Sequence, residues 1–360
     1  MKKIYYLFLM IIFISCNRTI DKETPALINF TEINDFNNRK IDIHNLFDKY
    51  KLIELETKEE TLIGGSEIKV IKKNDSYYVK SYNQILKFDS IGKFENKIIA
   101  GAGGPEDCGD ILDFDVVPER NSVLISGLEG LYEFTADSLK FRSKVKYPTY
   151  ISKFKYIGED KIIARTPDEK VFKIFDLEGN FLDSYFDKEI ALSGMKTVDF
   201  IKIDNKYMSQ IDNTNQAISY DPVNKEFKIV DIIHPSENLN SIEKEIKLYK
   251  ETDEFEFISK IFDTYTGISS FREVNGQYIL ILNHPKRTWS IVCIPKTGTP
   301  TNNIYFPEEK NTIVNNIEVH TDPRYLTTLI STDSDDSFIF LMEDPESEEN
   351  PILLEVFNLK

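Results

Sequence analysis

One hairpin sequence recurs along this chain, and the repetition constrains the fold more than any other feature. Phe-Asp, two residues, Gly, one residue and Phe occur in "ILKFDSIGKF" and again in "VFKIFDLEGNF". Related hairpins are spaced by 46, 41 and 45 residues, anchored on Phe88, Phe134, Phe175 and Tyr220. Two later segments, around Cys293 and Phe357, bring the set to six. A period of about 40–45 residues is typical of propeller blades.

Each hairpin follows two shorter apolar strands joined by a polar turn, as in "EIKVIKKNDSYYVKSYN" and "FREVNGQYILILNHPK". A unit therefore has four antiparallel strands, and a sheet that is apolar on both faces must pack against its neighbours. We predict an all-β fold, a six-bladed β-propeller of four-stranded antiparallel blades. The expected blades are about 66–98, 111–145, 152–187, 198–233, 268–306 and 325–360.

The last blade lacks an outermost strand, because the chain ends on the third-strand sequence "LLEVFNLK". The segment "YKLIELET", at about 50–57, is expected to supply the missing strand and to protect the open sheet edge. The propeller is thus expected to occupy 41–360, after a tether at 16–40.

The chain begins like a secreted protein. Lys2 and Lys3 precede the apolar run Ile4–Ile14, which is too short to span a bilayer but fits a signal peptide at 1–15. Small Ser15 before Cys16 resembles the lipobox of bacterial lipoproteins. We expect lipidation of Cys16 and a membrane partner held through an N-terminal acyl anchor. The alternatives are an ordinary secretory signal and an uncleaved anchor.

Composition limits the partners. The net charge of −16 becomes −18 once Lys2 and Lys3 leave with the signal peptide, so nucleic acid is not an expected partner. With 41% apolar and 12% aromatic residues, the chain can bury a large core. Cys108 and Cys293 lie in different repeats and are predicted to be buried free thiols.

Three segments carry a resemblance to a known family: "IELETKEETLIG", "GAGGPEDCGDILDFDV" and "NNIEV". The chain resembles the six-bladed β-propeller lipoproteins of gut-type Gram-negative bacteria, a TolB-like or NHL-like propeller. Here the glycine loop (101–106) lacks the arginine common in that family, and the late segment (315–320) lacks its glycines. The resemblance implies the fold and a cell-envelope location, at the outer membrane and facing the periplasm or the cell surface. It transfers no catalytic residues.

Long connections between blades are expected on a single face, since strand direction alternates within each blade. They are the loop at 100–110, a short helical insertion between blades 4 and 5, and the segment at 307–324. Asn240 and Glu243 resemble a capping box at the start of the insertion. Functional loops commonly gather on one side of a rigid scaffold, so we predict that this face binds the ligand. The alternative is that the helix only plugs one end of the channel.

Candidate binding residues come from four places. "NHPKRTW" supplies a basic and aromatic patch of His284, Lys286, Arg287 and Trp289, suited to stacking on sugars and pairing with carboxylates. The alternative is that Trp289 packs between blades. The glycine loop adds Glu106 and Asp107, and the late insertion adds Glu318 and His320. Asp113 and Asp115 alternate on one strand face toward the channel.

The predicted function is binding of a glycan, a peptide or an envelope protein. One alternative is a polysaccharide lyase or hydrolase that uses channel-facing carboxylates such as Asp113 and Asp115. Another is a scaffold subunit of an outer-membrane assembly. No nucleophile, base and orienting acid can be paired from the sequence, which favours binding over catalysis. The four histidines lack metal-ligand spacing, so neither a metal nor a cofactor is predicted.

Overall fold

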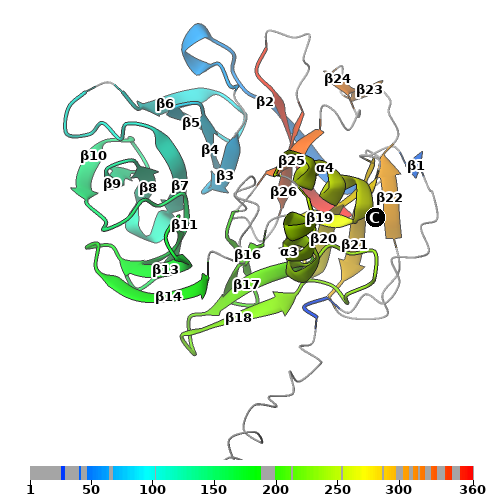
Figure 1. Ribbon diagram of the computed structural model, residues 1–360. Coiled ribbons are helices and arrows are strands. Elements are labelled where there is room, and N and C mark those ends of the chain that lie inside the picture. Colours follow the sequence, from blue (N-terminus) through cyan, green and yellow to red (C-terminus); the bar gives the residue numbers. More distant parts are fainter. Residues whose placement is uncertain are drawn as a thin grey trace, which may run out of the picture.

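The computed structural model describes residues 26–28, 40–41, 47–64, 68–101, 103–187, 199–211, 214–252, 254–285, 288–296, 303–307, 311–314, 317–320, 326–330, 337–342 and 349–359. Six sheets succeed one another around a common centre, five of them with four antiparallel strands and one with a fifth strand added (Figure 1). The first strands of neighbouring blades touch there, as β3 does with β7 and β7 with β11. The predicted six-bladed propeller is confirmed.

The first four blades follow the chain in order. Blade 1 contains β3 (Lys69–Lys73), β4 (Ser76–Ser81), β5 (Gln84–Phe88) and β6 (Phe94–Ile99), and blade 2 contains β7 (Ile111–Val117), β8 (Ser122–Gly127), β9 (Gly130–Thr135) and β10 (Phe141–Val145). Blade 3 contains β11 (Lys153–Gly158), β12 (Lys161–Arg165), β13 (Lys170–Asp176) and β14 (Phe181–Asp187). Blade 4 contains β15 (Ile201–Ile203), β16 (Lys206–Gln210), β17 (Gln216–Asp221) and β18 (Glu226–Asp231).

The last two blades incorporate strands from the N-terminal region. Blade 5 contains β19 (Gly267–Val274), β20 (Gln277–His284), β21 (Thr288–Pro295) and β22 (Asn303–Pro307), with β1 (Lys40–Ile41) added in parallel to β22. Blade 6 contains β25 (Leu326–Ile330), β26 (Phe338–Met342), β27 (Ile352–Leu359) and, outermost, β2 (Phe47–Glu54). Between these blades, β23 (Asn311–Val314) and β24 (Ile317–His320) form a separate hairpin. Two 3-10 turns are η1 (Glu59–Thr61) and η2 (Pro118–Arg120).

The repeated hairpin joins the third and fourth strands of a blade, and its geometry explains the repetition. In blade 3 the Asp176 carboxylate accepts hydrogen bonds from the backbone N–H groups of Glu178 (3.0 Å) and Asn180 (2.8 Å). Gly179 takes the left-handed φ of +92° that closes the turn. Aromatic rings on the two strands pack edge to face in the pairs Phe88–Phe94, Phe134–Phe141 and Phe175–Phe181. Blades 1 and 3 share the sequence because both make the same turn, and blades 1 to 3 pack the outer strand through the same aromatic pair.

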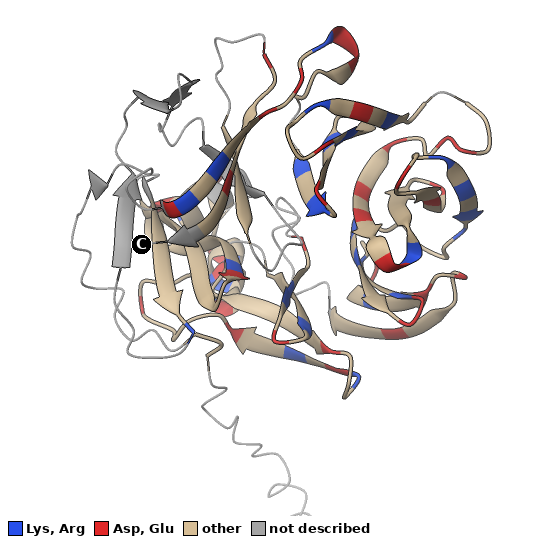
Figure 2. Ribbon diagram, turned by 180° about the vertical axis from the view of Figure 1, so that it is seen from behind, with Lys and Arg blue, Asp and Glu red and all other residues tan. Residues whose placement is uncertain are grey.

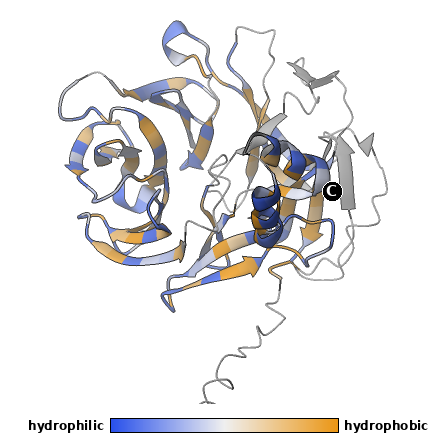
Figure 3. Cartoon of the chain, viewed as in Figure 1, coloured by the Kyte–Doolittle hydropathy of each residue, from blue (hydrophilic) through white to orange (hydrophobic). Residues whose placement is uncertain are grey.

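Six hydrophobic clusters hold the described part of the ring together, one at each boundary between successive blades. The boundary between blades 6 and 1, for example, buries Ile53 and Leu353 against Val70 and Val79. Hydrophobic residues run along the blade strands, whereas α3 (Ile242–Glu251) is largely hydrophilic (Figure 3). Every blade is therefore buried on both faces, and its stability depends on both neighbours.

The outermost strand of blade 6 is β2, which comes from the other end of the chain. It runs antiparallel to β27, with Tyr50 opposite Val356 and Ile53 opposite Leu353. This pairing connects the N-terminal region to the last strand and closes the ring.

The side-chain amide of Asn350 anchors the segment that follows β2. Asn350, between β26 and β27, accepts a hydrogen bond on Oδ1 from the Ile63 N–H (2.8 Å). Its Nδ2 donates to the carbonyls of Glu56 (3.0 Å) and Thr61 (2.9 Å). The buried amide thus fixes the crossing from blade 6 to blade 1.

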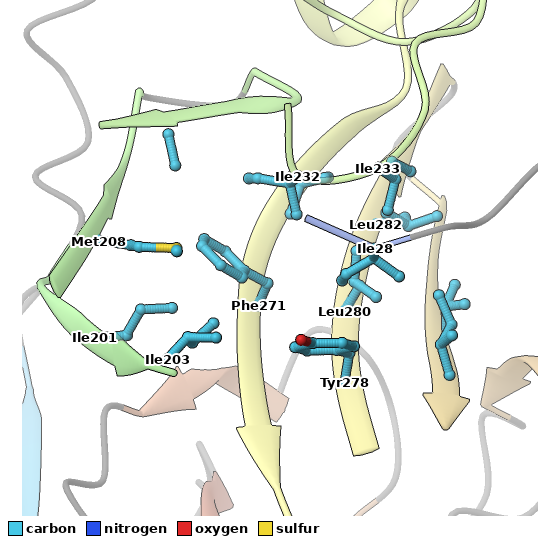
Figure 4. Packing of buried hydrophobic residues seen from close by; sticks show 14 of the residues in the cluster. Ile28, Ile201, Ile203, Met208, Ile232, Ile233, Phe271, Tyr278, Leu280 and Leu282 are labelled. Atoms are coloured by element: carbon cyan, nitrogen blue, oxygen red, sulfur yellow. The ribbon is translucent and has the colours of Figure 1, made fainter. Parts of the chain in front are cut away.

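The N-terminal region also contacts blades 4 and 5. Backbone N–H groups of Leu27 and Ile28 donate to the carbonyls of Asp231 (2.8 Å) and Ile232 (2.9 Å). Figure 4 shows Ile28 beside Ile232 and Ile233 in the cluster between these blades. Residues 26–28 are therefore part of the folded domain, within the range assigned to the tether from the sequence.

The helical insertion lies between blades 4 and 5, as predicted. It consists of α3 and α4 (Glu254–Thr264), labelled in Figure 1. Ile242 of α3 packs in the cluster between blades 3 and 4, and α4 contacts β20 of blade 5. No helix in the described part of the chain is long and apolar enough to cross a membrane.

The expected capping box at Asn240 is wrong. Ser241 is the N-cap of α3, and its hydroxyl accepts from the Lys244 N–H (3.4 Å). Asn240 is buried: its backbone N–H donates to the Thr266 carbonyl (2.9 Å) and its Nδ2 to Glu245 Oε1 (2.8 Å). Because Asn240 closes the base of the insertion, the next residue takes the capping position.

We expect Gly92→Ala to destabilise the ring more than Gly158→Ala. Both glycines have a similar left-handed φ, +86° and +88°, which costs alanine about 1–2 kcal/mol. Only at Gly92 would a Cβ meet backbone, at 2.0 Å from the Glu54 oxygen of β2, whereas nothing lies within 4 Å at Gly158. The overlap should cost about a further 1–3 kcal/mol, measurable as a difference between urea unfolding curves. Equal losses would contradict the close approach of blade 1 to β2.

Candidate functional site

A cavity of about 190 Å³ lies on the propeller axis, and every blade contributes to its wall. Its lining includes one residue from each of blades 1 to 6 in turn: Lys73, Asp115, Lys155, Lys202, Arg272 and Ser337. Most of these residues stand near the turn from the first to the second strand of their blade. We call this side of the ring the turn face, and the side carrying α3 and α4 the insertion face. The cavity lies toward the turn face, opposite the face expected from the sequence.

Arg272, on β19, is the most unusual residue of the wall. It is only 9% exposed, and its Nε has no hydrogen-bond partner. Burial lowers the pKa of the guanidinium to about 10, although Asp199 acts in the opposite direction. The group still carries its charge at neutral pH. Burying a cation with an unsatisfied hydrogen-bond donor lowers the stability of the fold, so stability alone does not explain this arginine.

Lys155 and Asp115 face each other across the boundary between blades 2 and 3. Lys155 Nζ donates to Asp115 Oδ1 at 2.8 Å, and the Tyr156 N–H donates to Oδ2 at 2.9 Å. Burial lowers the pKa of Lys155 to about 8, and the Asp115 carboxylate limits the decrease. The lysine is therefore mostly protonated at neutral pH.

A second group of charges lies along the same first strands, toward the insertion face. Lys69 lies 2.8 Å from Asp113 and 3.7 Å from Asp199, while Lys153 lies 3.3 Å from Asp199 and 4.0 Å from Asp113. Burial acts to raise the pKa of Asp199, but Lys153, Lys69 and Arg272 outweigh it and hold the pKa below its usual range. These ions neutralise one another. Figure 2 shows acidic and basic residues interspersed along blades 1 to 3.

The structure gives Asp113 and Asp115 a positioning role. Asp113 Oδ2 accepts the Phe154 N–H at 2.9 Å, just as Asp115 Oδ2 accepts that of Tyr156. Two carboxylates at i and i+2 on β7 therefore bind two backbone groups at i and i+2 on β11. These hydrogen bonds join β7 and β11, the innermost strands of blades 2 and 3. Both carboxylates therefore have a structural role that catalysis does not require.

Of the remaining predicted residues, Glu106, Asp107 and His284 are not among those that line this cavity. On the insertion side, Asp107 accepts from the N–H groups of Gly101 (2.7 Å), Gly103 (2.8 Å) and Gly109 (2.8 Å), so it organises its own loop. These bonds lower the pKa of Asp107. Glu106 is exposed beside it.

The predicted basic and aromatic patch is only partly described. His284 is buried, with Nε2 at 2.7 Å from Ser290 Oγ and Nδ1 at 3.4 Å from Thr266 Oγ1. Burial lowers its pKa to about 4, so the ring is neutral at pH 7. Trp289 pairs with Asn283 in the sheet. Lys286 and Arg287 lie outside the described residues, as does Cys16.

Glu318 and His320 belong to the separate hairpin, opposite Ile313 and Asn311 of β23. Both remaining cysteines, Cys108 and Cys293, are buried free thiols, and burial raises the pKa of each to about 12. Among the described residues, no three His, Cys, Asp or Glu side chains are grouped to hold a metal ion.

The sequence does not mark Lys73, Lys155, Lys202 and Arg272 as cavity residues, because each comes from a different blade. One usable signal was present for the innermost strands. Asp113-Phe114-Asp115 in blade 2 is matched by Lys153-Phe154-Lys155 in blade 3, an opposite-charge pattern with the same spacing. No comparable signal marks Arg272.

Comparison with known proteins agrees with this architecture. A family model described as a 6-bladed beta-propeller, DUF5128, matches residues 17–297. The chain belongs to this propeller family. No curated protein matches the sequence.

Two solved structures of similar shape come from Bacteroides species. This DUF5128 propeller is similar to a candidate exported protein of Bacteroides fragilis NCTC 9343, with a TM-score of 0.69 and 15% identity over 90% of this chain and 98% of the other. A member of the DUF4221 family from Bacteroides vulgatus ATCC 8482 aligns with a TM-score of 0.56 and 13% identity, covering 88% and 98% of the two chains. At such identities the likeness shows the fold alone.

We expect Asp113→Asn to lower the stability of this DUF5128 propeller by about 3 kcal/mol, because it removes the charge that pairs with buried Lys69. Glu129→Gln is the matched control. Its salt bridge with Lys144 is exposed, so the loss should stay below about 1 kcal/mol. Unfolding in guanidinium chloride, monitored by fluorescence, measures the stability of both variants. An Asp113→Asn protein as stable as the control would contradict the positioning role.

Proposed function

We propose that this protein is a lipid-anchored binding module of the cell envelope, and that its ligand binds in the axial cavity. The observation that carries the proposal is Arg272, a buried guanidinium that lines the cavity and whose charge only Asp199 compensates, through space. Folding alone gains little from such a group, because apolar residues of similar size would pack at lower cost. Perturbed, poorly compensated charges in a cavity are typical of functional sites.

The shape of the wall supports the same proposal. Because each blade contributes, the cavity exists only in the complete ring, and the scaffold holds its polar groups in fixed positions. A neighbouring hollow at the turns of blades 4 and 5 shares Lys202 and Glu273. A ligand longer than the cavity can extend in that direction.

The envelope location rests on the N-terminus and on analogy. Lys2, Lys3, the apolar run 4–14 and Cys16 form a lipoprotein-like signal. The structural neighbour from Bacteroides fragilis is itself a candidate exported protein. Because residues 26–28 pack between blades 4 and 5, a lipid on Cys16 would hold the domain close to the membrane surface.

This proposal places the ligand on the turn face, whereas the sequence favoured the insertion face. The glycan and peptide partners expected from the sequence both remain compatible with a polar cavity. An envelope-protein partner at the insertion face is the competing outcome.

We expect saturable binding of at least one small polar ligand to the domain 17–360, lost in Lys202→Trp because the indole obstructs the exposed rim of the cavity. Lys228→Trp is the control, since Lys228 is an exposed lysine on the outer strand β18, away from the cavity. Isothermal titration against neutral and acidic monosaccharides and short peptides tests both variants. Binding that survives Lys202→Trp, or no binding at all, would overturn the proposal.

A further inference from the structure

We infer that the axial cavity selects a ligand carrying a carboxylate, which binds the guanidinium of Arg272, and that the carboxylate is borne by an acidic sugar of monosaccharide size. This inference rests on the proposed function, because it names the ligand class of the same site.

The hydrogen-bonding capacity of Arg272 points to an acceptor supplied from outside. A guanidinium has five N–H donors and no acceptor, and buried donors are almost always satisfied. Arg272 lines the cavity, and Asp199 compensates its charge only through space. Asp199 is itself 3.3 Å from Lys153. A carboxylate matches the planar fork of arginine with two parallel hydrogen bonds.

The other charges of the wall agree with an anionic ligand. Three lysines, Lys73, Lys155 and Lys202, line the cavity together with Arg272, against the acids Asp115, Glu119 and Glu273. Two of these acids already have cationic partners: Lys155 lies 2.8 Å from Asp115, and Lys296 lies 2.6 Å from Glu273. The described lining is thus net positive, in a protein whose overall charge is −16. A positive cavity in an acidic protein favours a small anion over a cation.

Size and polarity narrow the ligand further. A dry cavity of about 150 Å³ accommodates a six-membered ring, so 190 Å³ suits a single pyranose with its substituents. Tyr156, Tyr207 and Ser337 also line the cavity. Phenol and hydroxyl groups hydrogen-bond sugar hydroxyls, and aromatic rings pack on sugar faces. A hexuronic acid combines the required carboxylate with these hydroxyls.

The first test compares D-galacturonate with its methyl ester and with D-galactose, by isothermal titration of the domain 17–360. We expect the acid to bind at least tenfold more tightly than the two neutral sugars. Arg272→Gln should abolish this preference, and Arg272→Lys should retain part of it, since lysine keeps the charge without the fork. Arg142→Gln is the matched control, an arginine on the outer strand β10 that should leave the preference intact.

A short peptide with a free C-terminus, compared with its amide, tests the other source of a carboxylate. A preference for the free peptide over galacturonate would reject the sugar while retaining the carboxylate. If acidic and neutral sugars bind equally and both are lost in Lys202→Trp, the cavity is the site but the inference about Arg272 is wrong. Binding that is unaffected by Lys202→Trp would refute the proposed function itself.

Thermal unfolding without ligand separates a binding role from a structural one. Arg272→Met removes a buried charge that has little compensation, so its melting temperature should equal or exceed that of the wild type. Galacturonate should raise the melting temperature of the wild type but not that of Arg272→Met. A marked destabilisation by Arg272→Met would show that the arginine supports the fold, and would overturn the inference.

Discussion

The pairing of β2 with β27 is the contact on which the rest of the structure depends. Six sheets that are apolar on both faces can be buried only if the first and last blades also meet, and β2 completes blade 6 where it packs on blade 1. Buried Glu355 strengthens the same boundary, accepting from Lys72 (2.6 Å), Tyr77 (2.7 Å) and Ser337 (2.6 Å). An open ring would expose a sheet edge and separate the walls of the axial cavity.

Closure explains why the axis can hold charge. Most of the boundary between blades is apolar, so the buried ions concentrate on the first strands, where the sheets converge. The charges of Lys69, Asp113, Lys153 and Asp199 neutralise one another there, and Asp113 also binds the backbone of β11. Arg272 differs, because its charge has no direct partner within the described ring. Both the positioning ions and the proposed ligand site therefore follow from one geometric constraint, which is that six edges meet at a centre.

The sequence predicted what local chemistry determines. The Phe-Asp-x-x-Gly hairpins are visible because Asp176 and Gly179 act within four residues of each other, and the missing last strand implied a donor near residue 50. The cap of α3 was misplaced by one residue, because Asn240 is engaged by Thr266 across the insertion. The cavity could not be predicted, since its walls come from blades up to about 260 residues apart in the chain. Nothing in "SSFREV" indicates that Arg272 is buried without a partner.

Hydrogen exchange in strand β2 tests the role of closure most directly. If the ring opens only when the whole domain unfolds, amides of residues 47–54 should exchange as slowly as those of β26 and β27, as measured by mass spectrometry on native protein. Exchange in β2 that is orders of magnitude faster, while all six blades stay protected, would show that the propeller holds without this strand. The pairing would then be an accessory of the fold rather than its central constraint.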